Sequence, residues 1–183
     1  LADLRLNSGA RYAVVTLHRP SNVDDPAMLE RIMGVLEEIA REMPVIFPVH
    51  PRTRSHLNRG SAPLFSPDQP RGSLPLLLID PLGYLDFLKL MAHARIVLTD
   101  SGGIQEETTI LGTPCLTLRD NTERPITVEM GTNRLVGSDP GKIFEGYRAV
   151  LAEVQKEGRT PHLWDGHAAQ RITDVLLNKL PNH

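Results

Sequence analysis

Residues 96–124 read IVLTDSGGIQEETTILGTPCLTLRDNTER and form the unit around which the rest of the chain can be arranged. The apolar run at 96–99 predicts a buried strand, and the small residues after it predict a sharp turn. A helix is expected over 104–111, because Gly112 stands where a helix commonly ends. Residues 115–118 predict the next strand, so this stretch indicates a strand–helix–strand unit of an α/β fold.

The turn between the strand and the helix has the features of an anion-binding site. The first N–H groups of a helix have no partner within it, and the positive end of the helix dipole lies beside them. Phosphate is therefore favoured at Ser101, Gly102 and Gly103. Glu107 follows Gly103 by one helical turn, and its carboxylate can accept hydrogen bonds from the two hydroxyls of a ribose. Arg124 can contact a diphosphate through two guanidinium nitrogens.

A structural interpretation is open for each of these residues. Small-residue turns are common, so Ser-Gly-Gly can be an ordinary turn and Glu107 a solvated side chain. Arg119 and Arg124 flank acidic residues, and both arginines can belong to a salt-bridge network. Cys115 has no accompanying base, which favours a core residue over a nucleophile. Phe87 is, by its sequence context alone, an ordinary core aromatic.

Strands and helices alternate along the whole chain. The predicted strands are residues 12–17, 45–49, 76–79, 96–99, 115–118 and 134–136. The predicted helices are residues 26–40, 54–58, 84–93, 104–111, 140–157 and 166–180. Alternation of this kind predicts a parallel sheet with helices on both faces. Six strands suit the doubly wound, Rossmann-like order 3-2-1-4-5-6.

Strands one and four are neighbours in that order, at the point where the winding reverses direction and ligands commonly bind. His18 follows strand one and Ser101 follows strand four, so the topology brings their segments together. His50 follows strand two at the same edge of the sheet. A histidine in such a place is as often structural as functional. No GxGxxG motif follows strand one, which argues against NAD.

The composition limits the classes of function. With 183 residues and 40% hydrophobic residues, the chain can bury the core of one domain. A net charge of −2 argues against a nucleic-acid or membrane surface. A single cysteine allows no disulfide framework and suits a cytoplasmic protein. Seven histidines are scattered and no Asp-x-Asp motif occurs, so neither a metal nor another cofactor is predicted.

Three motifs resemble the signature of one enzyme family. They are DSGGIQEE at 100–107, LGTPCLTLRDNTERP at 111–125 and GTNRLVG at 131–137. Together they resemble the non-hydrolysing UDP-N-acetylglucosamine 2-epimerases, and the resemblance extends over most of the chain. It implies the C-terminal half of a two-domain, glycosyltransferase-B-like fold. It also implies UDP-N-acetylglucosamine or UDP as the ligand and a homodimer for the full-length enzyme.

The resemblance implies a reaction and a division of labour. UDP-N-acetylglucosamine and UDP-N-acetylmannosamine would be interconverted by elimination and re-addition of UDP. The family's acid and base carboxylates belong to its N-terminal domain, so this chain alone is expected to be inactive. The implied layout is a connector over 1–11, a UDP-binding domain over 12–165 and a crossover helix over 166–183. The loop 59–73 is longer than the family pattern, and no function is assigned to it.

The resemblance also assigns roles to individual residues. His18 is the expected catalytic residue. The expected UDP-binding residues are Arg19, His50, Phe87, Ser101, Gly102, Gly103, Glu107 and Arg124. Many relatives continue the His-Arg pair with Arg-Glu-Asn, which helps to bind a second, regulatory UDP-N-acetylglucosamine in some bacterial members. Residues 20–22 are Pro-Ser-Asn here, which argues against such regulation.

Two other functions fit the same sequence. A two-domain UDP-sugar glycosyltransferase would share this fold and a ribose-binding glutamate. A non-catalytic UDP-binding module would share the site and lack the reaction. Only the epimerase exchanges the hydrogen at C2 of the sugar with solvent, so turnover in deuterated water distinguishes it from the transferase.

Overall fold

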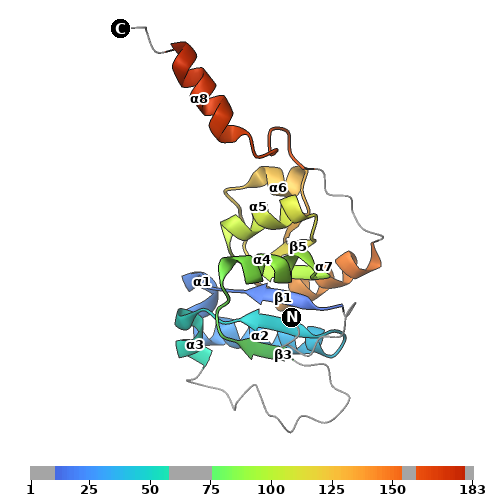
Figure 1. Ribbon diagram of the computed structural model, residues 1–183. Coiled ribbons are helices and arrows are strands. Elements are labelled where there is room, and N and C mark those ends of the chain that lie inside the picture. The colour runs from blue at the N-terminus through green and yellow to red at the C-terminus, as the bar shows by residue number, and fades with distance from the viewer. Residues whose placement is uncertain (1–10, 58–75, 154–159, 180–183) are drawn as a thin grey trace.

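The computed structural model describes residues 11–57, 76–153 and 160–179. Most of the expected connector 1–11 and the whole loop 59–73 lie outside these ranges. Within the described ranges, six strands form one sheet with helices on both faces (Figure 1). None of the described helices is long and apolar enough to span a membrane.

The strands lie in the order β3-β2-β1-β4-β5-β6, and every neighbouring pair is parallel. This order confirms the doubly wound, Rossmann-like fold. The strands are β1 Ala13–Thr16, β2 Val45–Pro48, β3 Leu76–Ile79, β4 Ile96–Thr99, β5 Cys115–Thr117 and β6 Asn133–Leu135. The helices are α1 Pro20–Val23, α2 Pro26–Ala40, α3 Pro51–Leu57, α4 Tyr84–Ala92, α5 Gly102–Leu111, α6 Pro125–Glu129, α7 Pro140–Ala152 and α8 Ala168–Lys179.

The ends of the main helices follow from their capping residues. The Asp25 carboxylate accepts a hydrogen bond from the Ala27 N–H at 3.0 Å, and Asp139 does the same for the Lys142 N–H at 3.0 Å. A proline follows each aspartate as the first helical residue of α2 and α7. Helix α5 ends at Gly112, whose φ of 70° lies in the left-handed region that glycine adopts without strain.

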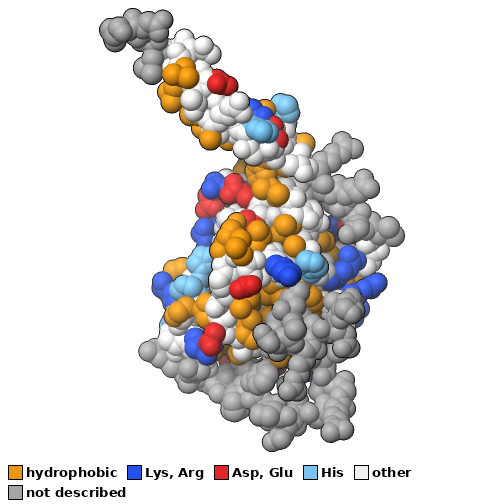
Figure 2. Space-filling view, viewed as in Figure 1, with side chains coloured by type: hydrophobic (Ala, Val, Ile, Leu, Met, Phe, Trp, Pro, Cys, Tyr) orange, Lys and Arg blue, Asp and Glu red, His pale blue; other side chains and the backbone are white. Residues whose placement is uncertain are grey.

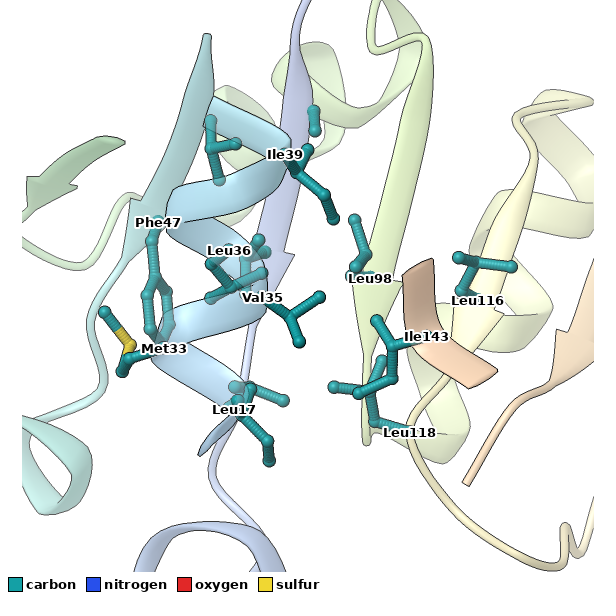
Figure 3. Close-up of a cluster of buried hydrophobic side chains, with 14 of the residues drawn as sticks. Leu17, Met33, Val35, Leu36, Ile39, Phe47, Leu98, Leu116, Leu118 and Ile143 are labelled. Atoms are coloured by element: carbon teal, nitrogen blue, oxygen red, sulfur yellow. The ribbon is translucent and has the colours of Figure 1, made fainter. Parts of the chain in front are cut away.

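Different helices cover the two faces of the sheet. Strand side chains alternate between faces, so Val15 and Leu98 belong to one apolar cluster and Val14 and Val97 to another. The larger cluster packs against α2 and α7, and Figure 3 shows Ile143 of α7 and several α2 side chains directed toward the strands. The smaller cluster packs against α4 and α5. The sheet is therefore fixed from both sides, which holds the strand ends in place.

Three helix starts were not expected from apolar periodicity. Helices α1, α3 and α6 begin at Pro20, Pro51 and Pro125, respectively. Proline suits the first helical position because the missing N–H would have no partner there. Helix α3 overlaps the helix expected over 54–58 but begins three residues earlier, whereas α1 and α6, of four and five residues, are too short for an apolar repeat to reveal them. Helix α5 begins at Gly102 rather than Ile104, so both glycines belong to its first turn.

Helix α8 is amphipathic but has no buried residue. Its exposed large apolar side chains are Ile172, Val175, Leu176 and Leu177. In Figure 1 this helix extends away from the sheet and its covering helices. The expected crossover helix therefore forms over most of its length, while its role and the domain boundary at residue 166 stay predictions.

Candidate functional site

The site begins where β1 and β4 end side by side. Thr16 pairs with Thr99 at the ends of these two parallel strands. The segments that follow carry His18 and Asp100, and His18 Nδ1 lies 3.0 Å from Asp100 Oδ1. In Figure 2, basic, acidic and histidine side chains gather along the edge toward which the strand arrows of Figure 1 point. The topology thus brings together the two segments that the sequence predicted to meet.

Asp100 is the most enclosed charged group at this edge. Its side chain is fully buried, yet it accepts hydrogen bonds from the backbone N–H of His18 at 3.1 Å and of Arg19 at 2.9 Å. Asn22 Nδ2 donates a third bond at 3.1 Å. Burial alone would raise the pKa of Asp100, but these donors and the His18 ring hold the pKa below its usual value. Asp100 is therefore a buried carboxylate that stays ionised.

Asn22 connects three segments of the site. It is 2% exposed, and its Nδ2 donates to Asp100 Oδ2 at 3.1 Å and to the Leu118 carbonyl at 3.0 Å. The ends of β1, β4 and β5 are joined by this one amide. Because the Asn22 amide is buried and hydrogen-bonded to protein groups, its role in this structure is to hold these segments together.

The His18 ring is partly exposed and oriented by Asp100. The hydrogen bond to Asp100 raises the pKa of His18, while burial and the neighbouring Arg19 charge oppose the shift. His50 lies close by, with its ring centroid 6.2 Å from that of His18. The His50 Nδ1 accepts a hydrogen bond from the Arg52 N–H at 3.2 Å. The structure therefore brings both predicted histidines to the same place, next to the predicted Arg19.

The start of α5 supplies fewer free N–H groups than expected. The Ser101 N–H donates to Thr99 Oγ1 at 3.0 Å, so it is already engaged. The Ser101 hydroxyl remains the group with which this residue would contact a phosphate. Gly102 and Gly103 form the first turn of a ten-residue helix, where N–H groups have no intrahelical partner. Anion binding at this point therefore depends on the two glycines and the helix dipole.

Glu107 has an unusual environment for a carboxylate. Its Oε2 atom is buried and, within the described residues, has no hydrogen-bond partner. Burial raises the pKa of Glu107, and the neighbouring Glu106 charge adds to the shift. A buried acceptor without a donor is costly, so this carboxylate would gain from a ligand that supplies hydroxyl groups. Glu107 is only partly buried as a whole, so the solvated interpretation fails for Oε2 and not for the entire side chain.

The segment 119–124, which we call the β5 loop, is held by ion pairs. Arg119 donates two hydrogen bonds of 2.8 Å to Glu123, and Arg19 reaches the same carboxylate at 3.4 Å. Arg124 pairs through Nε with Glu106 Oε1 at 2.9 Å. Arg119 thus fits the structural salt-bridge interpretation. Arg124 pairs with Glu106 of α5, which is adjacent in sequence to Glu107, the candidate ribose-binding residue.

Two further sequence candidates lie in apolar surroundings. Phe87 of α4 is half-buried and packs against the smaller apolar cluster. Its role in UDP binding stays a prediction. Cys115 is fully buried in β5, and burial raises the pKa of its thiol to about 11, which fits the core interpretation. Within the described ranges, no group of three or more His, Cys, Asp or Glu side chains could hold a metal ion.

Sequence reasoning did not select Asp100 or Asn22 as site residues. Asp100 directly follows the apolar residues of β4, and a carboxylate at the end of a buried parallel strand is a signal in its own right. Asn22 lay inside the segment considered only for its altered regulatory triplet. Its buried bonds to two other strand ends depend on the tertiary structure and have no local sequence signal.

Fold and site together define a doubly wound α/β protein with a glycine-containing helix start at its switch point, a position that favours anions. A family model described as UDP-N-acetylglucosamine 2-epimerase matches residues 2–177. The chain therefore belongs to the UDP-N-acetylglucosamine 2-epimerase family.

Individual relatives agree with this membership. A UDP-N-acetylglucosamine 2-epimerase of Methanocaldococcus jannaschii is 41% identical over 167 residues, which are 90% of this chain and 44% of that protein. A UDP-2,3-diacetamido-2,3-dideoxy-D-glucuronate 2-epimerase of Pseudomonas aeruginosa is 38% identical over 96% of this chain and 47% of that protein. This chain thus spans about half the length of the curated relatives it matches.

A solved structure resembles the fold closely. The UDP-GlcNAc 2-epimerase of Methanocaldococcus jannaschii, in complex with UDP-GlcNAc and UDP, superposes with a TM-score of 0.78 at 37% sequence identity. The superposition covers 96% of this chain and 48% of that chain. The likeness extends over nearly all of the present sequence and about half of the solved enzyme.

Proposed function

We propose that this chain is the UDP-binding half of a UDP-N-acetylglucosamine 2-epimerase. The enzyme would interconvert UDP-N-acetylglucosamine and UDP-N-acetylmannosamine by eliminating UDP and adding it back to the other face of the sugar. Membership of the epimerase family and the ligands of the related Methanocaldococcus jannaschii structure support the substrate class. The Pseudomonas aeruginosa relative acts on a different UDP-linked sugar, so the UDP portion is the part of the ligand common to both names.

The observation that carries this proposal is the Glu107 carboxylate. It lies one helical turn beyond Gly103, and its buried Oε2 has no hydrogen-bond partner in the described part of the chain. A free phosphate would be repelled by this charge, whereas a ribose would offer two hydroxyl donors. A helix start that favours phosphate and a nearby carboxylate that lacks donors together fit a nucleoside diphosphate.

The chemistry of the elimination assigns this half a defined task. As the bond between C1 of the sugar and the diphosphate breaks, its electron pair passes to the leaving β-phosphate oxygen. The N–H groups of Gly102 and Gly103 and the positive end of α5 would stabilise this growing charge. His18 and Arg124 would contribute hydrogen bonds from cationic groups. The groups that remove and return the C2 proton would lie outside this half.

Removal of the Glu107 carboxylate tests the ribose assignment. Glu107→Ala should weaken UDP binding by about 1.5–3 kcal/mol, the scale of hydrogen bonds to a charged group. Binding of inorganic diphosphate should hardly weaken, because it has no ribose that this carboxylate could bind. Titration calorimetry with the two ligands gives the comparison. Glu37→Ala, an exposed carboxylate on α2, is the matched control and should leave both affinities unchanged. An equal loss for UDP and diphosphate in Glu107→Ala would refute the ribose contact.

The division of labour is tested by turnover. The 183-residue chain should bind UDP yet show no exchange at C2 when it is incubated with UDP-N-acetylglucosamine in deuterated water. One lobe also leaves the bound diphosphate exposed to water, which weakens the electrostatic stabilisation. Mass spectrometry of the recovered sugar nucleotide detects exchange. Deuterated product above trace level would show that this chain carries its own acid and base.

The proposal extends to the full-length protein in three respects. The exposed apolar residues Ile172, Val175 and Leu176 of α8 would pack against the remaining half of the enzyme. A substitution such as Leu176→Asp should then lower the free energy of unfolding of the full-length enzyme more than that of this chain.

The full-length enzyme would be a homodimer in the cytoplasm. Light scattering and cell fractionation test these last two points directly.

A further inference from the structure

This inference rests on the proposed function and assigns a role to a residue that lies behind the site. We propose that Asp100 is the positioning residue of His18, and that it fixes the ring so that Nε2 is presented as a hydrogen-bond donor to the diphosphate. Asn22 belongs to the same unit because it holds the Asp100 carboxylate from the opposite side.

The first argument is the way in which Asp100 holds His18. The carboxylate accepts hydrogen bonds from the His18 backbone N–H at 3.1 Å and lies 3.0 Å from the ring Nδ1. Both contacts involve Oδ1, so the backbone and the ring are fixed to the same buried atom. Turning the ring over would take Nδ1 away from Asp100 and deprive a buried charge of a donor. Nε2 is therefore the ring nitrogen available to a ligand.

The second argument is that Asp100 itself has little freedom to move. Its Oδ2 accepts from the Arg19 N–H at 2.9 Å and from Asn22 Nδ2 at 3.1 Å. Asn22 is anchored in turn to the Leu118 carbonyl at 3.0 Å. The carboxylate is thus connected to segments after β1, β4 and β5. A rigid support of this kind is what a donor needs in order to meet a charge that develops during reaction.

The third argument is electrostatic. Below its pKa the His18 ring carries hydrogens on both nitrogens, and Nε2 donates to an anion. Above its pKa the ring keeps the Nδ1 hydrogen toward Asp100, and Nε2 becomes an acceptor that repels phosphate oxygens. Asp100 raises the pKa of His18 against burial and the Arg19 charge. The donor form of the ring therefore persists to higher pH than it would without Asp100.

Other charged groups surround this pair and belong in the interpretation of any pH dependence. Arg19 follows His18 in sequence and lies 3.4 Å from Glu123 of the β5 loop. The Arg119 guanidinium, which pairs with Glu123, also interacts with the Asp100 carboxylate through its charge. The His50 ring lies 6.2 Å from the His18 ring, centroid to centroid. Of these groups, Asp100 alone is within hydrogen-bond distance of His18 Nδ1 in the described part of the chain.

The binding experiment uses UDP-N-acetylglucosamine, because both of its phosphates are esterified and do not titrate near neutral pH. Affinity measured by calorimetry should fall as pH rises through the pKa of His18, since the donor form of Nε2 is lost. In Asp100→Asn the fall should begin about one pH unit lower, the scale set by loss of an adjacent opposite charge. At a pH above the new midpoint, affinity should be about tenfold weaker than in the unchanged protein. His18→Gln should abolish the pH step.

Nitrogen-15 NMR of the histidine rings separates this role from a merely structural one. At high pH the single ring hydrogen of His18 should lie on Nδ1 in the unchanged protein. This measurement needs no variant and no ligand. His93 serves as an internal reference, because its Nδ1 contacts the Lys89 carbonyl at 2.9 Å, and its signals should be the same in Asp100→Asn. A hydrogen on Nε2 of neutral His18, or an unchanged His18 titration in Asp100→Asn, would overturn the proposal.

The two assays also separate this proposal from the proposed function. If UDP-N-acetylglucosamine does not bind, the proposed function fails, while the NMR titration still decides whether Asp100 controls the His18 ring. If the ligand binds with an affinity that is independent of pH between 5 and 9, the role of Nε2 as a donor is refuted and UDP binding stands.

Discussion

The two sides of the site are built in opposite ways. The β1–β4 junction comprises His18, Arg19, Asn22 and Asp100. It is anchored by two enclosed side chains, since Asp100 is 0% and Asn22 2% exposed, and it presents the partly exposed His18 and Arg19. The β5 loop depends on ion pairs whose acidic side is open to solvent, since the Glu123 side chain is 56% exposed while its partner Arg119 is 8% exposed. Both sides would contact the same diphosphate. One is anchored by buried side chains, and the other is held by ion pairs whose carboxylates are open to solvent.

The difference has a physical consequence. A buried hydrogen-bonded group is expensive to leave without a partner, so the junction resists rearrangement. An exposed ion pair contributes little to stability and is screened by salt, so the loop can exchange partners at small cost. Arg124, which pairs with Glu106, would exchange partners in this way under the proposed function. The junction would supply fixed geometry, and the loop would supply adjustable charge.

The largest expected effect is on the junction. Asn22→Ala removes the amide group that donates one hydrogen bond to Asp100 and one to the Leu118 carbonyl. The variant should lower the free energy of unfolding by about 2–3 kcal/mol. Asn121→Ala is the matched control in the β5 loop, where the exposed Asn121 only accepts a bond from Arg119. Urea denaturation of both variants measures the difference. Equal and small losses would show that the junction is no more rigid than the loop.

The fold could be predicted from sequence because its determinants are local. Apolar strands at regular intervals, together with Asp25 and Asp139 at helix starts, gave the parallel order that the structure confirms. Helices α1 and α6 were not predicted, since four or five residues cannot show a periodic apolar face. Helix α8 shows the converse limit, because its periodicity predicts a helix but not the surface against which that helix packs.

The candidate site was predictable in part for the same reason. The positions of His18 and of the glycines follow from strand ends and topology, which the sequence contains. The enclosure of Asp100, and of the Glu107 Oε2 that has no donor among the described residues, depends on packing between segments far apart in the chain. The pairing of Arg124 with Glu106 likewise follows from how the β5 loop lies against α5. Such contacts become visible only in three dimensions.

A smaller effect is expected for Arg124 and concerns affinity. Arg124→Lys keeps the charge but loses the planar pair of donors, so UDP should bind about tenfold more weakly, the scale of one hydrogen bond between charged groups. Arg148→Lys on α7, where the arginine pairs with Glu42, is the control and should not change UDP affinity. Calorimetry measures both. If Lys at position 124 binds UDP as well as Arg, the residue acts as a distant charge.

The smallest effect is expected for Glu123, and it tests the loop side of the comparison most directly. Hydrogen bonds from Arg119 lower the pKa of Glu123 to about 2, so the ion pair contributes above the ordinary glutamate pKa and is lost as pH falls toward 2. Glu123→Gln should shift the Tm by at most ~2 °C near pH 7. The difference between Glu123→Gln and the unchanged protein should shrink as salt is raised from 0.1 to 1 M, because the screening length falls from about 10 to 3 Å. Lowering the pH below 4 should also bring the two curves together. A large, salt-independent loss would mean that Glu123 is as firmly built in as Asp100, and the contrast between the two sides of the site would disappear.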